Sequence, residues 1–454
     1  MTSQHREIQW SKTDWSLHDV TRAWSWALAC GVTLLSACAS NKAPPDQIFL
    51  MPAPVVYTEG RIDPFLDGSV TIQDSQPCVL FATDRAPTQD AERFAYYSDE
   101  RGNALRLGEA CTQLGVDSPV SGAEARRISL LKNRGENYPL KVTSIDEYGV
   151  LERTVPPFTS DIERSPIPGK RFAAAIDERL AASTAKDIYI YVHGYKVEFE
   201  NPVLVAAELW NFLGYNGAFI AYSWPATRET LAYWSDLDDA ANSARGLRML
   251  ITYLAAHTDA ERIHVIGYSA GTQLVARTLA DLGMYGRFMD EAEIRRRAKL
   301  GNVILVGSDV DRHVLGGYIL DGALRVPQAL TIYQSSRDSA LELSRRVFRR
   351  DRAGQSIATD SSGDASKAFL LQNPKLRVID VSNAESGTAG TGHGYLRGSP
   401  WVSSDVLLTL LYDLEPAKRG LVHLPGSPVW AFPDDYIARL RRALMEVDPS
   451  VAAR

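Results

Sequence analysis

A serine between small residues is the clearest chemical signal in the sequence. The segment 267–271 reads GYSAG and is the only G-x-S-x-G pentapeptide of the chain. The β-branched run at 262–266 predicts a buried strand before it, and the apolar spacing at 274–282 predicts an amphipathic helix after it. Such a strand-turn-helix setting exposes a serine hydroxyl on a sharp turn, where the N–H groups of the helix N-terminus stabilise an oxyanion. The pattern predicts Ser269 as a nucleophile, with a capping serine in a glycine-rich turn as the alternative.

A serine hydroxyl requires a neighbouring base, because it is a weak nucleophile at neutral pH. In hydrolases with this turn the acid and then the histidine follow the serine, and the histidines after Ser269 are His313, His393 and His423. His393 is the best placed, since it follows a predicted strand at 376–381 and stands in a glycine-rich loop that lets the imidazole reach the serine. His423 is the second candidate, and a supporting or surface role is expected for His313.

The acid that orients the histidine should follow a strand between the serine and the histidine. The run 330–334 predicts such a strand, and Asp338 comes after it, just before a predicted helix. Asp338 is therefore the expected acid, although an acidic residue at a helix N-terminus also simply complements the helix dipole. Asp309 and Asp311, which follow the preceding predicted strand, are the alternatives.

Two backbone N–H groups are expected to bind the oxyanion. One belongs to Ala270, and the other belongs to Tyr195, which follows His193-Gly194 after a predicted strand. The glycine allows close backbone approach, and no proton transfer is assigned to His193. Trp224, at the end of the next predicted strand, is a candidate pocket wall, with simple packing as the alternative.

The elements that must position these residues alternate between short apolar runs and helix-length segments. This alternation is typical of an α/β fold with a mostly parallel central sheet flanked by helices. A helix is expected from a cap at Asn201 to residue 213. The predicted strands are 188–192, 218–222, 263–266, 303–306, 330–333 and 376–381.

The motifs at 191–195, 223–225, 267–271, 308–311, 335–338 and 392–395 together resemble the α/β-hydrolase superfamily, and more narrowly a bacterial family of uncharacterised serine hydrolases. The resemblance covers residues 187 to about 412. It implies an α/β-hydrolase fold and ester-type hydrolysis, as in a carboxylesterase or lipase, with no agreed substrate. The segment 81–85 (FATDR) is also similar to one that precedes the core in that family.

The resemblance and the composition shifts together predict the domain organisation. Residues 171–454 form the α/β-hydrolase domain, with a flexible loop near 351–367 where the sequence is polar and glycine-rich. Residues 61–170 form an N-terminal embellishment packed on this core.

The N-terminal segment indicates export. Residues 23–37 carry no charge and are too few for the roughly 20 needed to span a bilayer, which favours a signal peptide over a membrane helix. The residues before Cys38 resemble the lipobox of bacterial lipoproteins, which implies a signal peptide at 1–37, acylation of Cys38 and a tether at 38–60. Ala39 after the cysteine favours the outer membrane, facing the periplasm. A short buried helix is the alternative.

The charge balance and the cysteine spacing argue against a nucleic-acid-binding protein and against a zinc protein. Lys and Arg number 49 against 55 Asp and Glu, a net charge of −6, without the basic surplus that nucleic-acid binding requires. The four cysteines lack the spacing of a zinc site, and no phosphate-binding loop is present, so neither a metal nor a cofactor is expected. In an oxidising compartment Cys78 and Cys111 form a disulfide or remain two buried thiols.

The expected function is a membrane-anchored serine hydrolase that acts on a small-molecule or lipid-like ester through an acyl-serine intermediate. Two alternatives use the same fold. One is a lipoprotein that binds or assembles without turnover, and the other is an acyltransferase that uses the same three residues.

Overall fold

The computed structural model describes residues 47–60, 62–65, 77–91, 95–115, 120–226, 233–355, 363–384 and 391–447. The chain divides into two units, Met1–Gln47 and Ile48–Arg454. The predicted signal peptide 1–37 and Cys38 lie outside the described residues. No helix within the ranges above has both the length and the apolar character needed to cross a bilayer.

Strands and helices alternate along the second unit, as the sequence predicts. The strands are β1 (Cys78–Pro87), β2 (Tyr97–Leu114), β3 (Leu140–Val150), β4 (Asp187–Val192), β5 (Ala218–Ser223), β6 (Arg262–Tyr268), β7 (Leu300–Val306), β8 (Ala329–Gln334), β9 (Leu376–Asp380), β10 (Val422–His423) and β11 (Trp430–Ala431). The helices are α2 (Val55–Thr58), α3 (Gly122–Ser129), α4 (Ile167–Ala181), α5 (Glu200–Phe212), α6 (Tyr233–His257), α7 (Gly271–Tyr285), α8 (Glu291–Ala298), α9 (Arg312–Leu320), α10 (Ser339–Phe348), α11 (Gly363–Gln372), α12 (Tyr395–Gly398), α13 (Pro400–Tyr412) and α14 (Tyr436–Val447).

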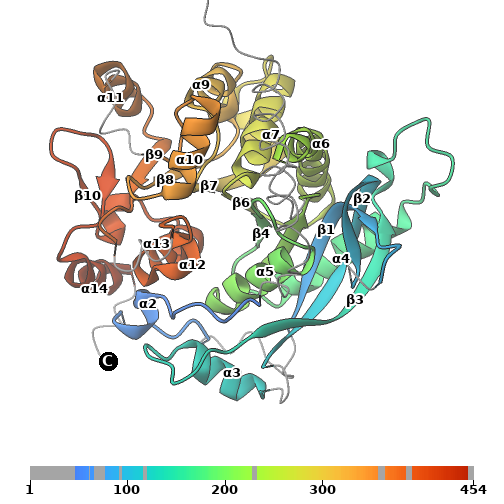
Figure 1. The fold of residues 1–454 in the computed structure, drawn as a ribbon, viewed down its shortest axis with the longest axis horizontal. Coiled ribbons are helices and arrows are strands. Elements are labelled where there is room, and N and C mark those ends of the chain that lie inside the picture. The colour runs from blue at the N-terminus through green and yellow to red at the C-terminus, as the bar shows by residue number, and fades with distance from the viewer. Residues whose placement is uncertain are drawn as a thin grey trace, which may run out of the picture. The chain divides into compact units, whose positions relative to one another are not determined.

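These strands form one large sheet flanked by helices, so the predicted α/β-hydrolase architecture is confirmed (Figure 1). The order is β10-β11-β9-β8-β7-β6-β4-β5-β1-β2-β3. The central strands from β5 to β9 are parallel, and antiparallel pairs occur only toward the two edges of this described sheet. Each of the six strands predicted from the sequence is present within one to three residues of its expected bounds.

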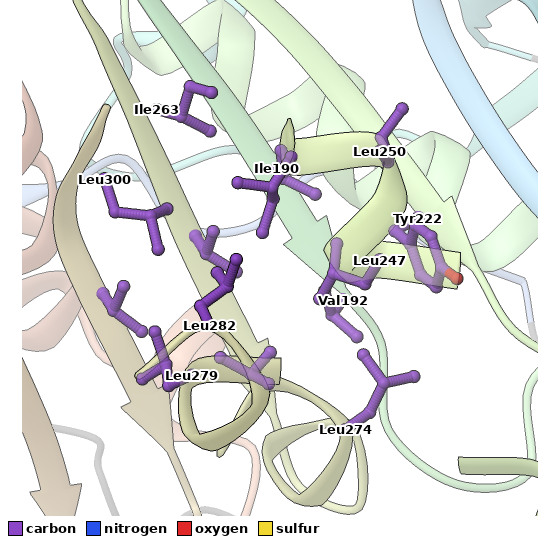
Figure 2. Packing of buried hydrophobic residues seen from close by; sticks show 14 of the residues in the cluster. Ile190, Val192, Tyr222, Leu247, Leu250, Ile263, Leu274, Leu279, Leu282 and Leu300 are labelled. Atoms are coloured by element: carbon purple, nitrogen blue, oxygen red, sulfur yellow. The ribbon is translucent and has the colours of Figure 1, made fainter. Parts of the chain in front are cut away.

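Alternate residues of each central strand enter different layers of the core, because successive side chains point to opposite faces of a sheet. Ile190 and Val192 of β4 pack with apolar residues of α4, α6 and α7, whereas Tyr189 and Tyr191 pack with those of α5 and α13. Figure 2 shows part of the first layer, where leucines of α6 and α7 close over Ile190 and Val192. Both faces of the sheet are thus buried, which explains the continuous apolar runs of these strands.

The site is set by the neighbours of β4. This strand pairs with β5 on one side and β6 on the other. The strand order therefore reverses at β4, because the chain adds β5 on one side of it and β6 on the other. In open α/β sheets such a switch point leaves a crevice at the carboxyl ends of the strands, where ligands bind. His193-Gly194 follows β4 and Ser269 follows β6, so both lie at this crevice.

The N-terminal embellishment continues the same sheet. β1 pairs parallel with β5, and β2 and β3 add antiparallel strands beyond it. Cys78 and Cys111 are register partners in β1 and β2 and form a disulfide, which settles between the two alternatives that the sequence left open.

The expected tether at 38–60 is too long. From Ile48 onward the segment packs on the core, with Met51, Val55 and Val56 buried and α2 within it. Its apolar side chains, interrupted by prolines, fill a space beside α13 and α14. Residues 38–46 lie outside the described residues.

Two local predictions are also wrong. Asn201 does not cap α5, because the helix begins at Glu200 with Phe199 as the cap residue; Pro202 still falls in the first turn, where its missing N–H costs nothing. The loop expected at 351–367 is fixed at its start, where Arg352 and Ala353 are buried, and its end from Gly363 belongs to α11. Residues 356–362 lie outside the described part.

A fully buried ion pair joins α13 to the segment that follows it. Asp405 accepts hydrogen bonds from Arg419 Nε at 2.6 Å and from the Tyr333 hydroxyl at 2.6 Å. The pair thus holds that segment against α13 inside the core.

Removal of this carboxylate tests the pair. Asp405→Ala leaves a buried guanidinium without its carboxylate, so we expect the free energy of unfolding, measured in urea, to fall by about 3–5 kcal/mol. The matched control is Asp435→Ala at an exposed i,i+4 pair, expected to cost less than about 1 kcal/mol. Equal losses would contradict this assignment.

Candidate active site

Ser269 lies on a strained turn between β6 and α7. Its φ is +52°, a conformation that costs a non-glycine residue free energy and persists at functional sites. A Cβ at Gly271 would lie 2.1 Å from the His193 carbonyl oxygen, and one at Gly267 would lie 3.0 Å from Val275 Cγ2. Close packing against the loop after β4 therefore requires glycine at position 271, and a side chain at position 267 would force Val275 of α7 to shift.

Other positive φ angles have a different cause. Among the described non-glycine residues, Tyr215, Lys299, Arg349 and Asp413 have positive φ and lie just past the ends of helices, where this conformation ends a helix. Ser269 and Lys196 (φ +62°) follow strands instead. These two strained positions flank the crevice beside β4.

The structure brings together the serine, the histidine and the acid chosen from the sequence. His393 Nε2 lies 2.8 Å from Ser269 Oγ, and His393 Nδ1 lies 2.6 Å from Asp338 Oδ2. A carboxylate only accepts hydrogen bonds, so Nδ1 carries the ring proton and Nε2 is free to accept the proton of the serine hydroxyl. The side chain of Asp338 is fully buried, and that of His393 is 14% exposed.

Asp338 has two roles at once. Its Oδ1 accepts a hydrogen bond of 3.0 Å from the N–H of Leu341 and so caps α10. Its Oδ2 remains for His393. The two interpretations that the sequence offered for this residue are thus compatible, because each uses a different carboxylate oxygen.

The histidine loop is held against the acid loop and the end of β7. Thr391 O accepts a hydrogen bond from the N–H of Ser339, and a Cβ at Gly392 (φ +70°) would lie 2.3 Å from Arg337 O. A Cβ at Gly307 would lie 2.8 Å from Cε1 of the His393 ring. These contacts fix the imidazole between two backbone segments.

Tyr395 supports the same loop and was not found from the sequence. Its buried hydroxyl accepts a hydrogen bond of 2.7 Å from the N–H of Gly307 and donates one of 3.0 Å to Tyr333 O. One side chain thereby ties the histidine loop to the ends of β7 and β8. Only its position two residues after His393 could have indicated this role.

The loop after β4 lies directly over the serine. A Cβ at Gly194 would lie 2.7 Å from Ser269 Cβ, and Tyr195 follows it. Ala270 is the cap residue of α7. The two residues chosen as oxyanion donors therefore flank Ser269 on both sides, one on the loop and one at the helix N-terminus.

His193 and Trp224 are structural residues of this loop. His193 Nδ1 bonds to Gly194 O at 2.7 Å, its Nε2 accepts from the N–H of Trp224 at 3.1 Å, and Trp224 Nε1 donates to His193 O at 2.8 Å. Burial lowers the pKa of His193 well below its usual value, so the ring is neutral. Trp224 is fully buried and stacks on His193; it forms no pocket wall, because its indole is used to hold the loop.

The remaining candidates lie elsewhere. Asp309 is 3.3 Å from Arg352 in a buried ion pair, and Asp311 caps α9. His313 is exposed on the first turn of that helix, and His423 is exposed in the edge strand β10. None of these residues contacts Ser269 through a hydrogen bond in the described part of the chain.

Arg85, in the FATDR segment, is a buried positioning residue that sequence reasoning missed. Its guanidinium donates to the Ser223 hydroxyl at 3.0 Å, to Ser98 O at 3.3 Å and to Val197 O at 2.8 Å. Burial lowers its pKa to about 10. The side chain joins β2, the end of β5 and the loop over Ser269, which explains why this segment accompanies the hydrolase core.

A metal has no evident ligand set here. The described residues contain no group of three or more His, Cys, Asp and Glu side chains arranged to hold one. The chemistry available at the crevice is that of a hydroxyl, an imidazole, a carboxylate and backbone N–H groups.

Comparison with known proteins agrees with this architecture. Residues 170–410, just over half of the chain, match the family described as alpha/beta hydrolase of unknown function (DUF900). The chain belongs to this family and is an α/β hydrolase.

Two individual similarities are more limited. An uncharacterized protein of Nostoc sp. is 37% identical over 65 residues, which span 14% of this chain and 17% of that protein. The solved structure of Thermogutta terrifontis esterase 2 phosphoramylated by tabun is similar over 52% of this chain and 86% of that chain, with 13% identity and a TM-score of 0.29.

The contact between Gly271 and the His193 carbonyl can be tested directly. Gly271→Ala places a methyl group against the backbone of the loop after β4, which has no room to move. We expect the free energy of unfolding to fall by about 1–3 kcal/mol, seen as a lower thermal unfolding midpoint. Gly316→Ala is the matched control, because the Cβ meets nothing within 4 Å on α9 and alanine is the better helix former. An unchanged midpoint for Gly271→Ala would refute the close approach.

Proposed function

We propose that the protein is a serine hydrolase that cleaves carboxylic esters, as a carboxylesterase or lipase-like enzyme does, through an acyl-serine intermediate. The observation that carries the proposal is the chain of hydrogen bonds from Ser269 Oγ to His393 Nε2 and from His393 Nδ1 to Asp338 Oδ2. The family supports hydrolysis, and a serine activated by a histidine suits an acyl substrate.

The reaction has two halves. Ser269 Oγ attacks the ester carbonyl carbon while His393 Nε2 takes the hydroxyl proton, and the same proton passes to the alcohol oxygen as the acyl–oxygen bond breaks. A water molecule then gives a proton to His393 and attacks the acyl carbon, which releases the acid and restores the serine hydroxyl. Asp338 holds the imidazole in the required tautomer and stabilises its cation.

The oxyanion of each tetrahedral intermediate is bound by the backbone N–H groups of Ala270 and Tyr195 in this proposal. Ala270 stands at the N-terminus of α7, where the helix dipole favours negative charge. The buried pair His193 and Trp224 holds the loop that carries Tyr195. Donors fixed before the reaction stabilise charge without reorganisation.

Labelling with a fluorophosphonate probe, read by peptide mapping, tests this mechanism. We expect the label at Ser269 and none in Ser269→Ala, with ester hydrolysis lowered on the order of a thousandfold or more in Ser269→Ala and His393→Ala. Ser160→Ala, at an exposed serine, is the matched control and should label normally. A folded protein that takes no label at Ser269 would favour the non-catalytic binding module, and acyl products that form only with an added acceptor would favour the acyltransferase.

We further propose that the protein is exported and anchored to the outer membrane through acylated Cys38, facing the periplasm. The disulfide between Cys78 and Cys111 supports this, because disulfides persist in oxidising compartments. Intact-mass analysis of protein from the native membrane should give a chain that begins at a lipid-modified Cys38 and lacks residues 1–37. Cys38→Ser should remain unprocessed and unacylated. An unmodified Cys38 within the full-length chain would overturn the anchor.

A further inference from the structure

A cavity of about 220 Å³ lies between the loop after β4 and the histidine loop. Gly194, Tyr268 and Gly394 line it. Tyr268 and Gly394 adjoin Ser269 and His393 in the chain, and a Cβ at Gly194 would lie 2.7 Å from the Cβ of the serine. The wall of the cavity thus includes chain neighbours of Ser269 and His393, although neither of these two residues lines it.

Most of its remaining wall is aromatic or aliphatic. Tyr191, Tyr195, Val197, Val205 and Leu396 contribute to it, and Asn201 is the one neutral amide in the described lining. Drug-sized ligands occupy cavities of about 300–1,000 Å³, and this one is smaller. Its size and lining suit a short carbon chain.

Arg397 adds a strong donor to this lining. Its Nε donates to Glu208 Oε2 at 2.6 Å, and its Nη2 donates to Glu208 Oε1 at 3.2 Å and to Phe49 O at 2.7 Å. Nη1 has no hydrogen-bond partner among the residues that the structure describes, and the side chain is 29% exposed. The guanidinium is thus held rigidly while two N–H groups stay available, which is a preorganised site for an oxygen acceptor.

The charge around Arg397 favours an anionic acceptor. Glu208 is fully buried and also accepts from the N–H of Met51. Burial acts to lower the pKa of Arg397, but the charge of Glu208 raises it overall, so the guanidinium stays charged. A charged guanidinium with N–H groups to spare binds a carboxylate more strongly than a neutral oxygen.

We infer that this cavity binds the acyl group of the substrate and that this acyl group is short and ends in a carboxylate, which Arg397 binds through Nη1. The inference rests on the proposed esterase function. Tyr195, whose N–H is proposed to bind the carbonyl oxygen, also lines the cavity, so the acyl chain extends from that oxygen toward Arg397.

The 4-nitrophenyl monoester of glutaric acid tests this specificity against 4-nitrophenyl hexanoate, which has a similar length without the charge, and 4-nitrophenyl 5-oxohexanoate, which keeps a neutral oxygen. For the wild-type protein we expect kcat/KM to favour the glutarate ester over the hexanoate by roughly tenfold to a hundredfold, the value of a hydrogen bond to a charged group. The oxohexanoate should fall between them.

Two variants separate binding from folding. Arg397→Lys keeps the charge next to buried Glu208 but loses the planar fork, so the glutarate preference should fall at least about fivefold, mainly through KM. Val205→Phe fills the cavity from α5 and should lower kcat/KM for all three esters more than for 4-nitrophenyl acetate. Arg439→Lys, at an exposed pair, is the control and should keep the wild-type ratio.

Fluorophosphonate labelling separates the two ways of failing. If Ser269 is not labelled in the folded wild-type protein, the proposed function fails and the inference falls with it. If Ser269 is labelled but the hexanoate is cleaved as well as the glutarate ester, only the carboxylate specificity is overturned. A glutarate preference that survives in Arg397→Lys would overturn the role of Arg397.

Discussion

The site depends on one close approach between two backbones. At the turn after β6, Gly271 passes so near the His193 carbonyl oxygen that no side chain fits between them. This contact brings the loop after β4 over Ser269, and it holds the N-terminus of α7 beneath the same hydroxyl. The hydrophobic layers on both sides of the sheet supply the rigidity that keeps a strained serine (φ +52°) in place.

Parallel pairing brings the other two groups to the same edge. β6, β7, β8 and β9 are consecutive neighbours, so the segments that follow β8 and β9 end beside the segment that follows β6. Small residues and backbone hydrogen bonds then set the last few ångströms, as Gly307, Gly392 and Thr391 do around His393. The sheet thus determines which loops meet, and the loops determine the atoms that touch.

What could be predicted from the sequence was local. Ser269, Asp338 and His393 each follow a recognisable strand, and the strands follow from their apolar runs. The role of Trp224 could not be predicted, because the sequence pattern of an aromatic residue after a strand is the same whether the side chain lines a pocket or, as here, stacks on His193. The segment 48–60 and residues 351–355 read as flexible since their burial depends on distant partners. Arg85 and Arg397 were missed for the same reason: their roles come from contacts such as those with Val197 and Glu208, which are far away along the chain.

The parallel pairing of β1 with β5 shows that the folded domain is larger than the segment that matches the family. The family match begins at residue 170, yet β1 occupies the edge of β5 and its neighbour β2 is joined to it by the disulfide. A polypeptide that started at the matched boundary would leave the backbone donors and acceptors of β5 open, and an open edge recruits strands from other chains. The embellishment therefore supplies the partner strand of β5 in addition to holding Arg85, and it moves the edge of the described sheet out to β3.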